Sequence, residues 1–372
     1  MRATIFASVS LCLLTLFAVA DESAQSSRLS ELLTDNTEAG FKRANAAREF
    51  LFPRDHGPHE GFRNEWWYIT GNLDDDAGRR FGFELTIFRF SLTPGRPQAQ
   101  SDWRTNQVYI AHLAVTDVED ERFYVAERFS RGALGLAGAQ TEPFRVWIDN
   151  WEIASNGEGE SWRIVAADTD IAVDLALTAL KKPVLNGDAG LSRKSSNIDS
   201  ASYYYSITRF QTAGTVSIAG RNYRVSGLSW LDREWSTSAL AADQVGWDWF
   251  ALQLSSGTDV MLYNLRKSDA TVDANSSGTL TFADGRSTHL RVEDFNIRVN
   301  DTWDSPAGGT YPSSWRIHIP EQGLQLDVQP VLPNQELFTT VRYWEGAVDV
   351  SGEKNGVPIA GRGYVELTGY AD

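Results

Sequence analysis

The chain has 372 residues, with 34 Lys and Arg against 49 Asp and Glu, a formal net charge of −15. Its 42% hydrophobic and 22% charged residues are those of an ordinary globular protein, which excludes wholesale disorder, collagen and a cysteine-rich scaffold. The acidic balance argues against nucleic acid and anionic membrane surfaces as partners, because both attract basic faces.

The first twenty residues have the features of a secretory signal peptide. Arg2 is their one charge, residues 5–19 are almost wholly apolar, and a small-x-small cleavage pattern ends at Ala20. We therefore expect cleavage near Ala20 and a periplasmic or secreted protein without a transmembrane segment. The single cysteine, Cys12, lies inside the signal, so we expect no disulfide. The polar residues 21–50 are expected to form a mobile arm.

From Trp66 onward the hydrophobic pattern has a period of two, which indicates β-strands. Apolar residues alternate with polar or small ones over 81–89, 108–113 and 171–177, and turn signals rich in Gly, Asn and Asp separate such runs. Many short strands joined by hairpin turns predict an all-β antiparallel sandwich or barrel.

An internal repeat indicates the number of domains. An aromatic-rich strand opens each half, near Trp66 and near Trp247, and a Gly-interrupted strand that carries a carboxylate closes each half, at Asp232 and at Glu366. A chance match of two short hairpins is the alternative. We expect two tandem β-barrels of related design, with domains over 51–226 and 227–372.

Residues 229–236 are the strongest site candidate, because they hold two carboxylates, one guanidinium and two indoles. In an extended strand, Trp230, Asp232 and Glu234 share one face, while the residues between them share the other. A carboxyl group beside aromatic walls stays protonated more readily and can act as a general acid. The structural alternative is that Arg233 and a carboxylate only lock two domains together.

A Pro- and Gly-rich loop within residues 52–67 holds His56 and His59 beside Asp55 and Glu60. Such residues would suit a metal, but histidines at i and i+3 across a proline lack the i, i+4 helical spacing of zinc enzymes. The alternative is a hydrogen-bonded loop over the mouth of the first barrel. We expect no metal site.

Three further polar residues fall on predicted strands. Glu84 and His112 would be polar anchors in an aromatic lining if a barrel enclosed a ligand cavity. The alternative is that both point outward or satisfy each other in the core. Asp248 alternates with Trp247 and Trp249, which predicts that it faces solvent on the side opposite both indoles.

Several blocks of sequence resemble the AttH/CrtC family: residues 53–73, 230–236, 246–250, 343–347 and 361–370. The resemblance implies two lipocalin-like (calycin) barrels in tandem, in agreement with the repeat. One branch of the family comprises carotenoid 1,2-hydratases (hydroxyneurosporene synthases), which add water to a terminal double bond of acyclic carotenoids without a cofactor. Another branch, AttH-like, is found with ABC transporter components.

This sequence resembles the AttH-like branch more than the hydratase branch. In the hydratases a histidine follows the aspartate of the Trp-x-Asp block, whereas Arg233 follows Asp232 here. An arginine cannot shuttle a proton near neutral pH, so this departure weakens the transfer of hydratase activity. Gly-rich phosphate loops and serine-hydrolase elbows are absent from the sequence, and we expect no cofactor.

Two functions follow as expectations. The first is an exported lipocalin-type protein, associated with an ABC transporter, that binds a hydrophobic carotenoid, isoprenoid or lipid. Its ligand-binding residues would be Trp66, Trp67, Tyr68, Tyr204, Trp230, Trp235 and Trp249, with Glu84 and His112 as anchors. The alternative is a cofactor-free hydratase in which Asp232 delivers a proton to carbon, Glu234 positions water and an indole faces the carbocation.

Overall fold

The computed structural model describes residues 39–95, 101–157, 159–238, 240–241 and 243–371. The signal peptide expected over 1–20, and the expected arm as far as residue 38, lie outside the described residues. Within them, helix is confined to three short 3-10 turns, Arg54–His56, Val292–Asp294 and Pro320–Gln322. None of these described turns has the length or apolar character to cross a membrane.

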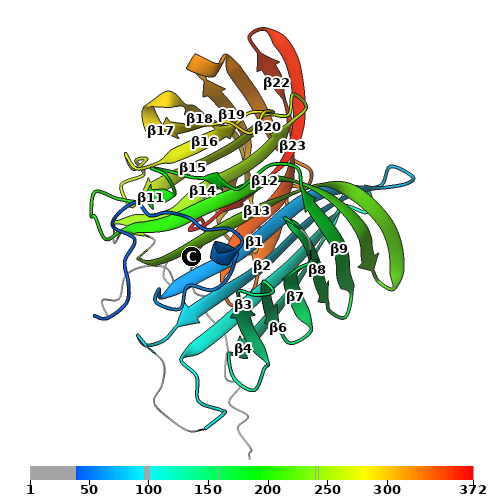
Figure 1. Cartoon of the computed structure of the whole chain (residues 1–372). Coiled ribbons are helices and arrows are strands. Elements are labelled where there is room, and N and C mark those ends of the chain that lie inside the picture. The colour runs from blue at the N-terminus through cyan, green and yellow to red at the C-terminus, as the bar shows by residue number, and fades with distance from the viewer. Residues whose placement is uncertain (1–38, 96–100, 158, 239, 242, 372) are drawn as a thin grey trace, which may run out of the picture.

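Two antiparallel β-sheets make up the fold (Figure 1), which confirms the all-β prediction. The first sheet has 13 strands in the order β4-β3-β2-β1-β13-β12-β9-β8-β7-β6-β5, with β10 and β11 paired to β12. It curves until β4 comes near β6, which leaves a nearly closed barrel. Its strands are β1 (Asn64–Asp75), β2 (Arg80–Ser91), β3 (Gln107–Asp117), β4 (Arg122–Arg131), β5 (Ala137–Gln140), β6 (Arg145–Ile148), β7 (Trp151–Ser155), β8 (Ser161–Ala167), β9 (Ile171–Ala179), β10 (Val184–Leu185), β11 (Leu191–Arg193), β12 (Ala201–Ile218) and β13 (Arg221–Ser238).

The second sheet has 10 strands in the order β17-β16-β15-β14-β23-β22-β20-β19-β18, with β21 paired to β22. The domain boundary expected between residues 226 and 227 falls inside β13, and the chain changes sheets only after Ser238. The strands of the second sheet are β14 (Gln244–Leu254), β15 (Asp259–Lys267), β16 (Ser277–Thr281), β17 (Ser287–Arg291), β18 (Asn296–Asp304), β19 (Thr310–Ile319), β20 (Leu324–Pro330), β21 (Glu336–Phe338), β22 (Arg342–Lys354) and β23 (Val357–Leu367).

The burial of each strand shows what covers its two faces. In β9 buried Ile171, Val173 and Leu175 alternate with more exposed neighbours, as expected for a strand with one solvent face. In β2 nearly every residue is buried. One face of β2 contributes Leu85 and Ile87 to the apolar core inside the barrel, and the other face is covered by the second sheet. The first sheet is therefore buried on both sides where the two sheets meet.

Charged groups fasten the two sheets together. Asp259 of β15 is fully buried and accepts hydrogen bonds from Lys181 Nζ (2.6 Å) and from Arg209 of the first sheet. At the other end of the contact, Arg80 pairs with Asp349, with 2.8 Å between Nη2 and Oδ1. These pairs hold the sheets in one relative position.

The described end of the expected arm packs against the first sheet. The backbone N–H of Lys42 donates to the carbonyl of Gly61 (2.8 Å), the Lys42 carbonyl accepts from the Thr237 hydroxyl, and Ala44 is buried. These contacts tie residues 42–44 to the first sheet, and the mobility expected of the arm stays a prediction.

Candidate functional site

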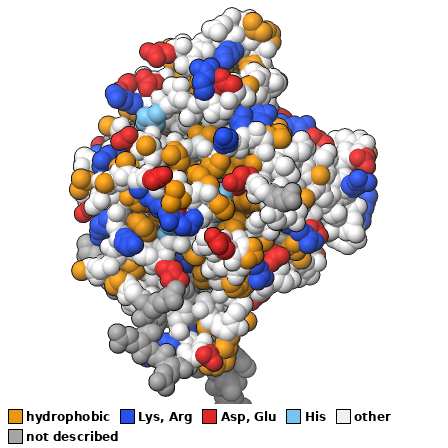
Figure 2. Space-filling view, in the orientation of Figure 1, with side chains coloured by type: hydrophobic (Ala, Val, Ile, Leu, Met, Phe, Trp, Pro, Cys, Tyr) orange, Lys and Arg blue, Asp and Glu red, His pale blue; other side chains and the backbone are white. Residues whose placement is uncertain are grey.

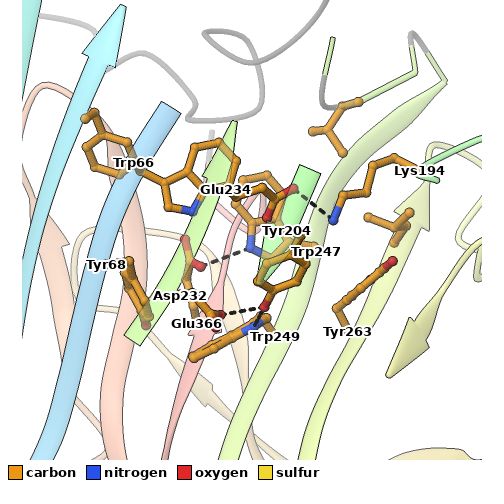
Figure 3. Close-up of a pocket in the computed structure, with 13 residues that line it drawn as sticks. Trp66, Tyr68, Lys194, Tyr204, Asp232, Glu234, Trp247, Trp249, Tyr263 and Glu366 are labelled. Carbon is orange, nitrogen blue, oxygen red and sulfur yellow. Dashed lines mark hydrogen bonds and ion pairs between the residues drawn. The ribbon is translucent and has the colours of Figure 1, made fainter. Parts of the chain in front are cut away.

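An aromatic pocket lies between the two sheets, on the outer side of the first barrel (Figure 3). The space between its walls is about 670 Å³ when the open mouth is included. Hydrophobic side chains gather near the middle of the face in Figure 2, amid charged groups of both signs. The pocket is lined by Trp66, Tyr68, Phe88, Lys194, Tyr204, Asp232, Glu234, Leu240, Trp247, Trp249, Tyr263, Leu265 and Glu366.

Strand alternation explains why these residues meet. Asp232 and Glu234 are two residues apart on β13, so they point to the same face, as the sequence predicts. Tyr68 of β1 is opposite Asp232 in the antiparallel register, and Trp66 is opposite Glu234. Directly opposite residues share a face, and these four side chains therefore form one wall of the pocket.

Asp232 is buried in a shell of donors. Its carboxyl accepts hydrogen bonds from Trp230 Nε1 (2.8 Å), from the Tyr204 hydroxyl (2.5 Å) and from Ser206 Oγ. Burial raises the pKa of Asp232 to about 7, although these hydrogen bonds oppose the rise. This carboxyl can therefore exchange a proton near neutral pH, as an acid–base catalyst must.

Glu234 belongs to a buried ion pair. Lys194 Nζ lies 3.1 Å from Glu234 Oε1, and Ser202 Oγ also donates to this carboxylate. Burial alone would lower the pKa of Lys194, but the Glu234 carboxylate outweighs it and the pKa is raised. The Lys194 ammonium also lies 4.4 Å from the ring centre of Tyr263. The pocket thus holds a fixed charge pair beside the Asp232 carboxyl.

Glu366 of β23 supplies a third carboxyl from the second sheet. Its Oε2 accepts a hydrogen bond from Trp247 Nε1 (3.1 Å). Burial, together with the negative charges of Asp232 and Glu234, raises the pKa of Glu366 to about 8, against the effect of that hydrogen bond. The sheet contact therefore brings two protonatable carboxyls into one pocket.

Two more carboxyls lie behind this wall. Glu84 and Glu345 are fully buried, and burial raises the pKa of both well above the usual value. The hydroxyl of Tyr68, which lines the pocket, donates a hydrogen bond to the Glu345 carboxyl. Neither oxygen of Glu84 has a hydrogen-bond partner among the described residues. Burial thus favours the protonated, uncharged form of both groups.

The sequence selected eleven site residues, and six of them line the pocket: Trp66, Tyr68, Tyr204, Asp232, Glu234 and Trp249. Trp230 does not line the pocket, but its indole N–H donates a hydrogen bond to Asp232, which does. Trp67 and Trp235 lie on the other face of the first sheet, in the core of the barrel. That core lies inside the barrel, whereas the pocket lies between the two sheets, a choice that the sequence left open.

Glu84 and His112 do not line the pocket, and they do not satisfy each other. His112 Nδ1 lies 2.7 Å from the Tyr343 hydroxyl of the second sheet, and its Nε2 lies 3.1 Å from Glu127. The histidine thus links the two sheets.

The solvent-facing position expected for Asp248 is wrong. Asp248 is buried, its Oδ1 lies 3.0 Å from Arg266 Nε, and it accepts a hydrogen bond from the Tyr370 hydroxyl. Its side does face away from both indoles. That side is covered by other parts of the second sheet, which local alternation cannot reveal.

The histidine loop is held by hydrogen bonds. His56 Nδ1 lies 2.6 Å from the Tyr205 hydroxyl, and the His59 ring stacks on Trp235 with 3.7 Å between centres. Across the described residues, no group of three or more His, Cys, Asp or Glu side chains is arranged to hold a metal ion. These contacts fit the alternative of a hydrogen-bonded loop.

Arg233 has a structural partner within the first sheet. It donates to Glu65, which is fully buried and also accepts from Arg89. The two guanidinium groups hold the pKa of Glu65 well below its usual range, against the effect of burial. Arg233 and Glu65 thus lock β13 to β1 and not one sheet to the other.

Sequence reasoning missed seven lining residues: Phe88, Lys194, Leu240, Trp247, Tyr263, Leu265 and Glu366. The repeat contained a signal for Glu366, because it aligns the closing strand of the second half with the strand that carries Asp232. Lys194 follows β11 in a loop and has no local pattern that would mark it.

A family model and a solved structure both relate this chain to AttH proteins. The AttH-like family model matches residues 43–370. A crystal structure described as an AttH from Nitrosomonas europaea has a TM-score of 0.78 and 32% identity, covering 87% of this chain and 98% of that one. Kievitone hydratase from Nectria haematococca has a TM-score of 0.69 and 17% identity over 91% and 98% of the two chains, which shows a shared fold.

Two curated proteins are similar in sequence. A kievitone hydratase from Fusarium solani subsp. phaseoli is 23% identical over 212 residues, which are 55% of this chain and 59% of that protein. Dehydratase asqC from Emericella nidulans is 24% identical over 238 residues, 59% of this chain and 64% of that protein. The chain therefore spans less than two thirds of the length of either relative.

Proposed function

The chain belongs to the AttH-like family, and we propose that it is a hydro-lyase that adds water to, or removes it from, an unsaturated apolar substrate. The observation that carries the proposal is Asp232. It is a buried carboxyl in an aromatic pocket, and burial raises its pKa to about 7. Such a group can lose and regain a proton at physiological pH.

The rest of the pocket suits this chemistry. Hydration of a carbon–carbon double bond places positive charge on carbon, and the faces of Trp66, Trp247 and Trp249 attract a cation. The Glu234–Lys194 pair offers an acceptor and a donor that would orient a water molecule. The largely apolar walls would bind the hydrocarbon part of the substrate.

The names of the relatives favour this function over simple ligand binding. Both curated relatives are named for the addition or removal of water, at low identity. The objection drawn from Arg233 loses its force, because that residue lies on the barrel side of β13, bound to Glu65. A proton shuttle in the pocket would not have to pass through that position.

Carriage of a hydrophobic ligand is the second candidate, because the same aromatic pocket would hold a carotenoid, an isoprenoid or a lipid. Export by a signal peptide and association with an ABC transporter remain predictions from the sequence. A carrier and a hydro-lyase share the binding step and differ only in turnover. The decisive measurement must therefore record binding and chemistry separately.

The test uses kievitone and geranylacetone as probes, incubated with the full chain in ¹⁸O-labelled water and analysed by mass spectrometry. We expect one labelled water to be added, with Asp232→Asn lowering the rate about 10²- to 10⁴-fold. Uptake of the fluorescent apolar probe N-phenyl-1-naphthylamine should be nearly unchanged in that variant. The control is Asp174→Asn on the exposed side of β9. Binding without turnover in the wild type would establish the carrier and refute the hydro-lyase.

A further inference from the structure

We propose that Glu366 is the catalytic proton donor of this pocket and that Asp232 is the proton acceptor, so that each sheet supplies one half of an acid–base pair. This assignment rests on the proposed hydro-lyase function and names its second catalytic residue. It differs from the expectation that Asp232 alone delivers the proton. Three independent features of the geometry support it.

The first feature is the equivalence of the two positions. Asp232 of β13 is paired in register with Tyr68 of β1, and Glu366 of β23 is paired in register with Trp249 of β14. All four side chains line the pocket. The two halves of the repeat therefore present the same arrangement, a carboxyl beside an aromatic ring, one from each sheet, and the two carboxyl side chains lie close together in Figure 3.

The second feature is the direction of the hydrogen bonds at Asp232. Trp230 Nε1 can only donate, and it donates to Asp232 Oδ1. Trp249 Nε1 donates to the Tyr204 oxygen (3.1 Å), which leaves the Tyr204 proton to point at Asp232 Oδ2. Donors thus occupy both oxygens of Asp232. This arrangement stabilises the carboxylate, the form that accepts a proton.

The third feature is the different surroundings of Glu366. Among the described residues it has one hydrogen-bond donor, Trp247 Nε1. Glu366 is half-buried as a residue, whereas Asp232 is buried, and both line the pocket. With few donors to stabilise its charge, Glu366 keeps its proton in the pH range where Asp232 has lost one.

The charged and titratable groups around Glu366 act in the same direction. Asp232 and Glu234 face it from β13, and their negative charges raise its pKa further, after burial, to about 8. Glu345 is opposite Glu366 in the β22–β23 register, and Glu84 also interacts with Glu366; burial raises the pKa of both and so favours their uncharged forms. Tyr68 on β1 and Tyr343 on β22 also face it, with pKa values raised by burial. Lys194 in the same pocket is already paired with Glu234.

Hydration by this pair consists of two proton transfers and the attack of one water molecule. The Glu366 carboxylic acid transfers its proton to one alkene carbon, so a C–H bond forms from the π pair and the neighbouring carbon becomes a cation. Water attacks that carbon, a C–O bond forms, and the Asp232 carboxylate takes the water proton. The net change is addition of one water. The proton then returns from Asp232 to Glu366 through water in the pocket, and dehydration is the reverse sequence.

The test compares Glu366→Gln and Asp232→Asn with a matched control, Glu345→Gln. Glu345 is a buried glutamate on the neighbouring strand that does not line the pocket. The first measurement is the infrared carboxylic-acid C=O band as a function of pH, without substrate. The difference between wild type and Glu366→Gln should isolate a band that disappears with a midpoint near pH 8. The second is the pH dependence of kcat/KM for the probe that is turned over.

We expect a bell-shaped wild-type profile, with an acid limb from Asp232 and an alkaline limb from Glu366. Glu366→Gln should lower kcat about 10²- to 10⁴-fold and remove the alkaline limb, Asp232→Asn should remove the acid limb, and Glu345→Gln should keep both limbs. Glu366→Asp, which keeps an acid one carbon shorter, should restore part of the rate. This rescue separates the loss of a proton donor from a failure to fold.

Two results would overturn the assignment: an unchanged acid band in Glu366→Gln, or an alkaline limb that persists in that variant. Loss of either pH limb in Glu345→Gln would also overturn it, because the limbs would then not belong to Asp232 and Glu366. A wild type that adds water to neither probe refutes the proposed function instead. The infrared titration still decides in that case whether Glu366 holds the proton while Asp232 is ionised.

Discussion

The substitution Asp232→Asn is predicted to change how the free energy of unfolding depends on pH. Burial raises the pKa of Asp232 from its usual 3.8 to about 7 in the folded protein. The unfolded chain therefore releases this proton near pH 4, while the folded protein holds it until about pH 7. The stability linked to Asp232 is full at low pH and is lost as the pH rises through this window.

The change in the free energy of unfolding follows from the difference between the pKa of Asp232 in the folded protein and in the unfolded chain. A difference of about 3 pH units corresponds to about 4 kcal/mol, at about 1.4 kcal/mol for each unit. An asparagine has no proton to release, so the variant does not carry this cost. Between pH 5 and pH 8, about 2 pH units (pH 5 to about 7) fall in the range where the folded protein holds the Asp232 proton and the unfolded chain does not. The free energy of unfolding of Asp232→Asn, relative to wild type, should rise by about 3 kcal/mol over that interval.

The assay is urea unfolding at pH 5 and pH 8, followed by tryptophan fluorescence. If the asparagine amide makes a weaker hydrogen bond than the carboxyl, the free energy of unfolding falls by the same amount at both pH values. This contribution therefore cancels when the two pH values are compared. The control is Asp174→Asn. Arg163 lowers the pKa of Asp174, with 2.7 Å between Nη2 and Oδ2, so this variant should parallel the wild type above pH 5. If Asp232→Asn also parallels the wild type, the Asp232 carboxyl ionises normally and the argument from the pocket fails.

Three further substitutions test the packing that holds the site. Glu65→Gln leaves two buried arginines without their carboxylate and should cost about 3–5 kcal/mol in urea unfolding; a loss below 1 kcal/mol would show that the network is solvated. Asp259→Asn removes the charge partner of Lys181 at the sheet contact, so calorimetry should resolve separate unfolding transitions for the two sheets. A single transition would contradict the role of this contact. Trp249→Ala should cost about 3–5 kcal/mol and change N-phenyl-1-naphthylamine uptake, and unaltered uptake would place the apolar probe outside this pocket.

The two-residue period of the sequence was sufficient to predict the all-β fold. Successive side chains of a strand point to opposite faces, so the pattern around β13 also predicted that Asp232 and Glu234 share a face and that Arg233 points the other way. The acid–base candidate at Asp232 followed from the indoles beside it in the sequence. These are local properties, and the chain's order of residues determines them.

Only the tertiary structure decided what covers each face. Alternation separates the two sides of a strand, but it does not say whether water, a barrel core or a second sheet lies on either side. For this reason the sequence could not say whether a ligand cavity lies inside a barrel or between two, and it placed Asp248 in solvent, whereas the second sheet creates the pocket and Asp248 is buried. Lys194 and Glu366 join Asp232 through contacts between segments far apart in the chain. Desolvation by those contacts raises the pKa of the two carboxyls, and no local pattern encodes it.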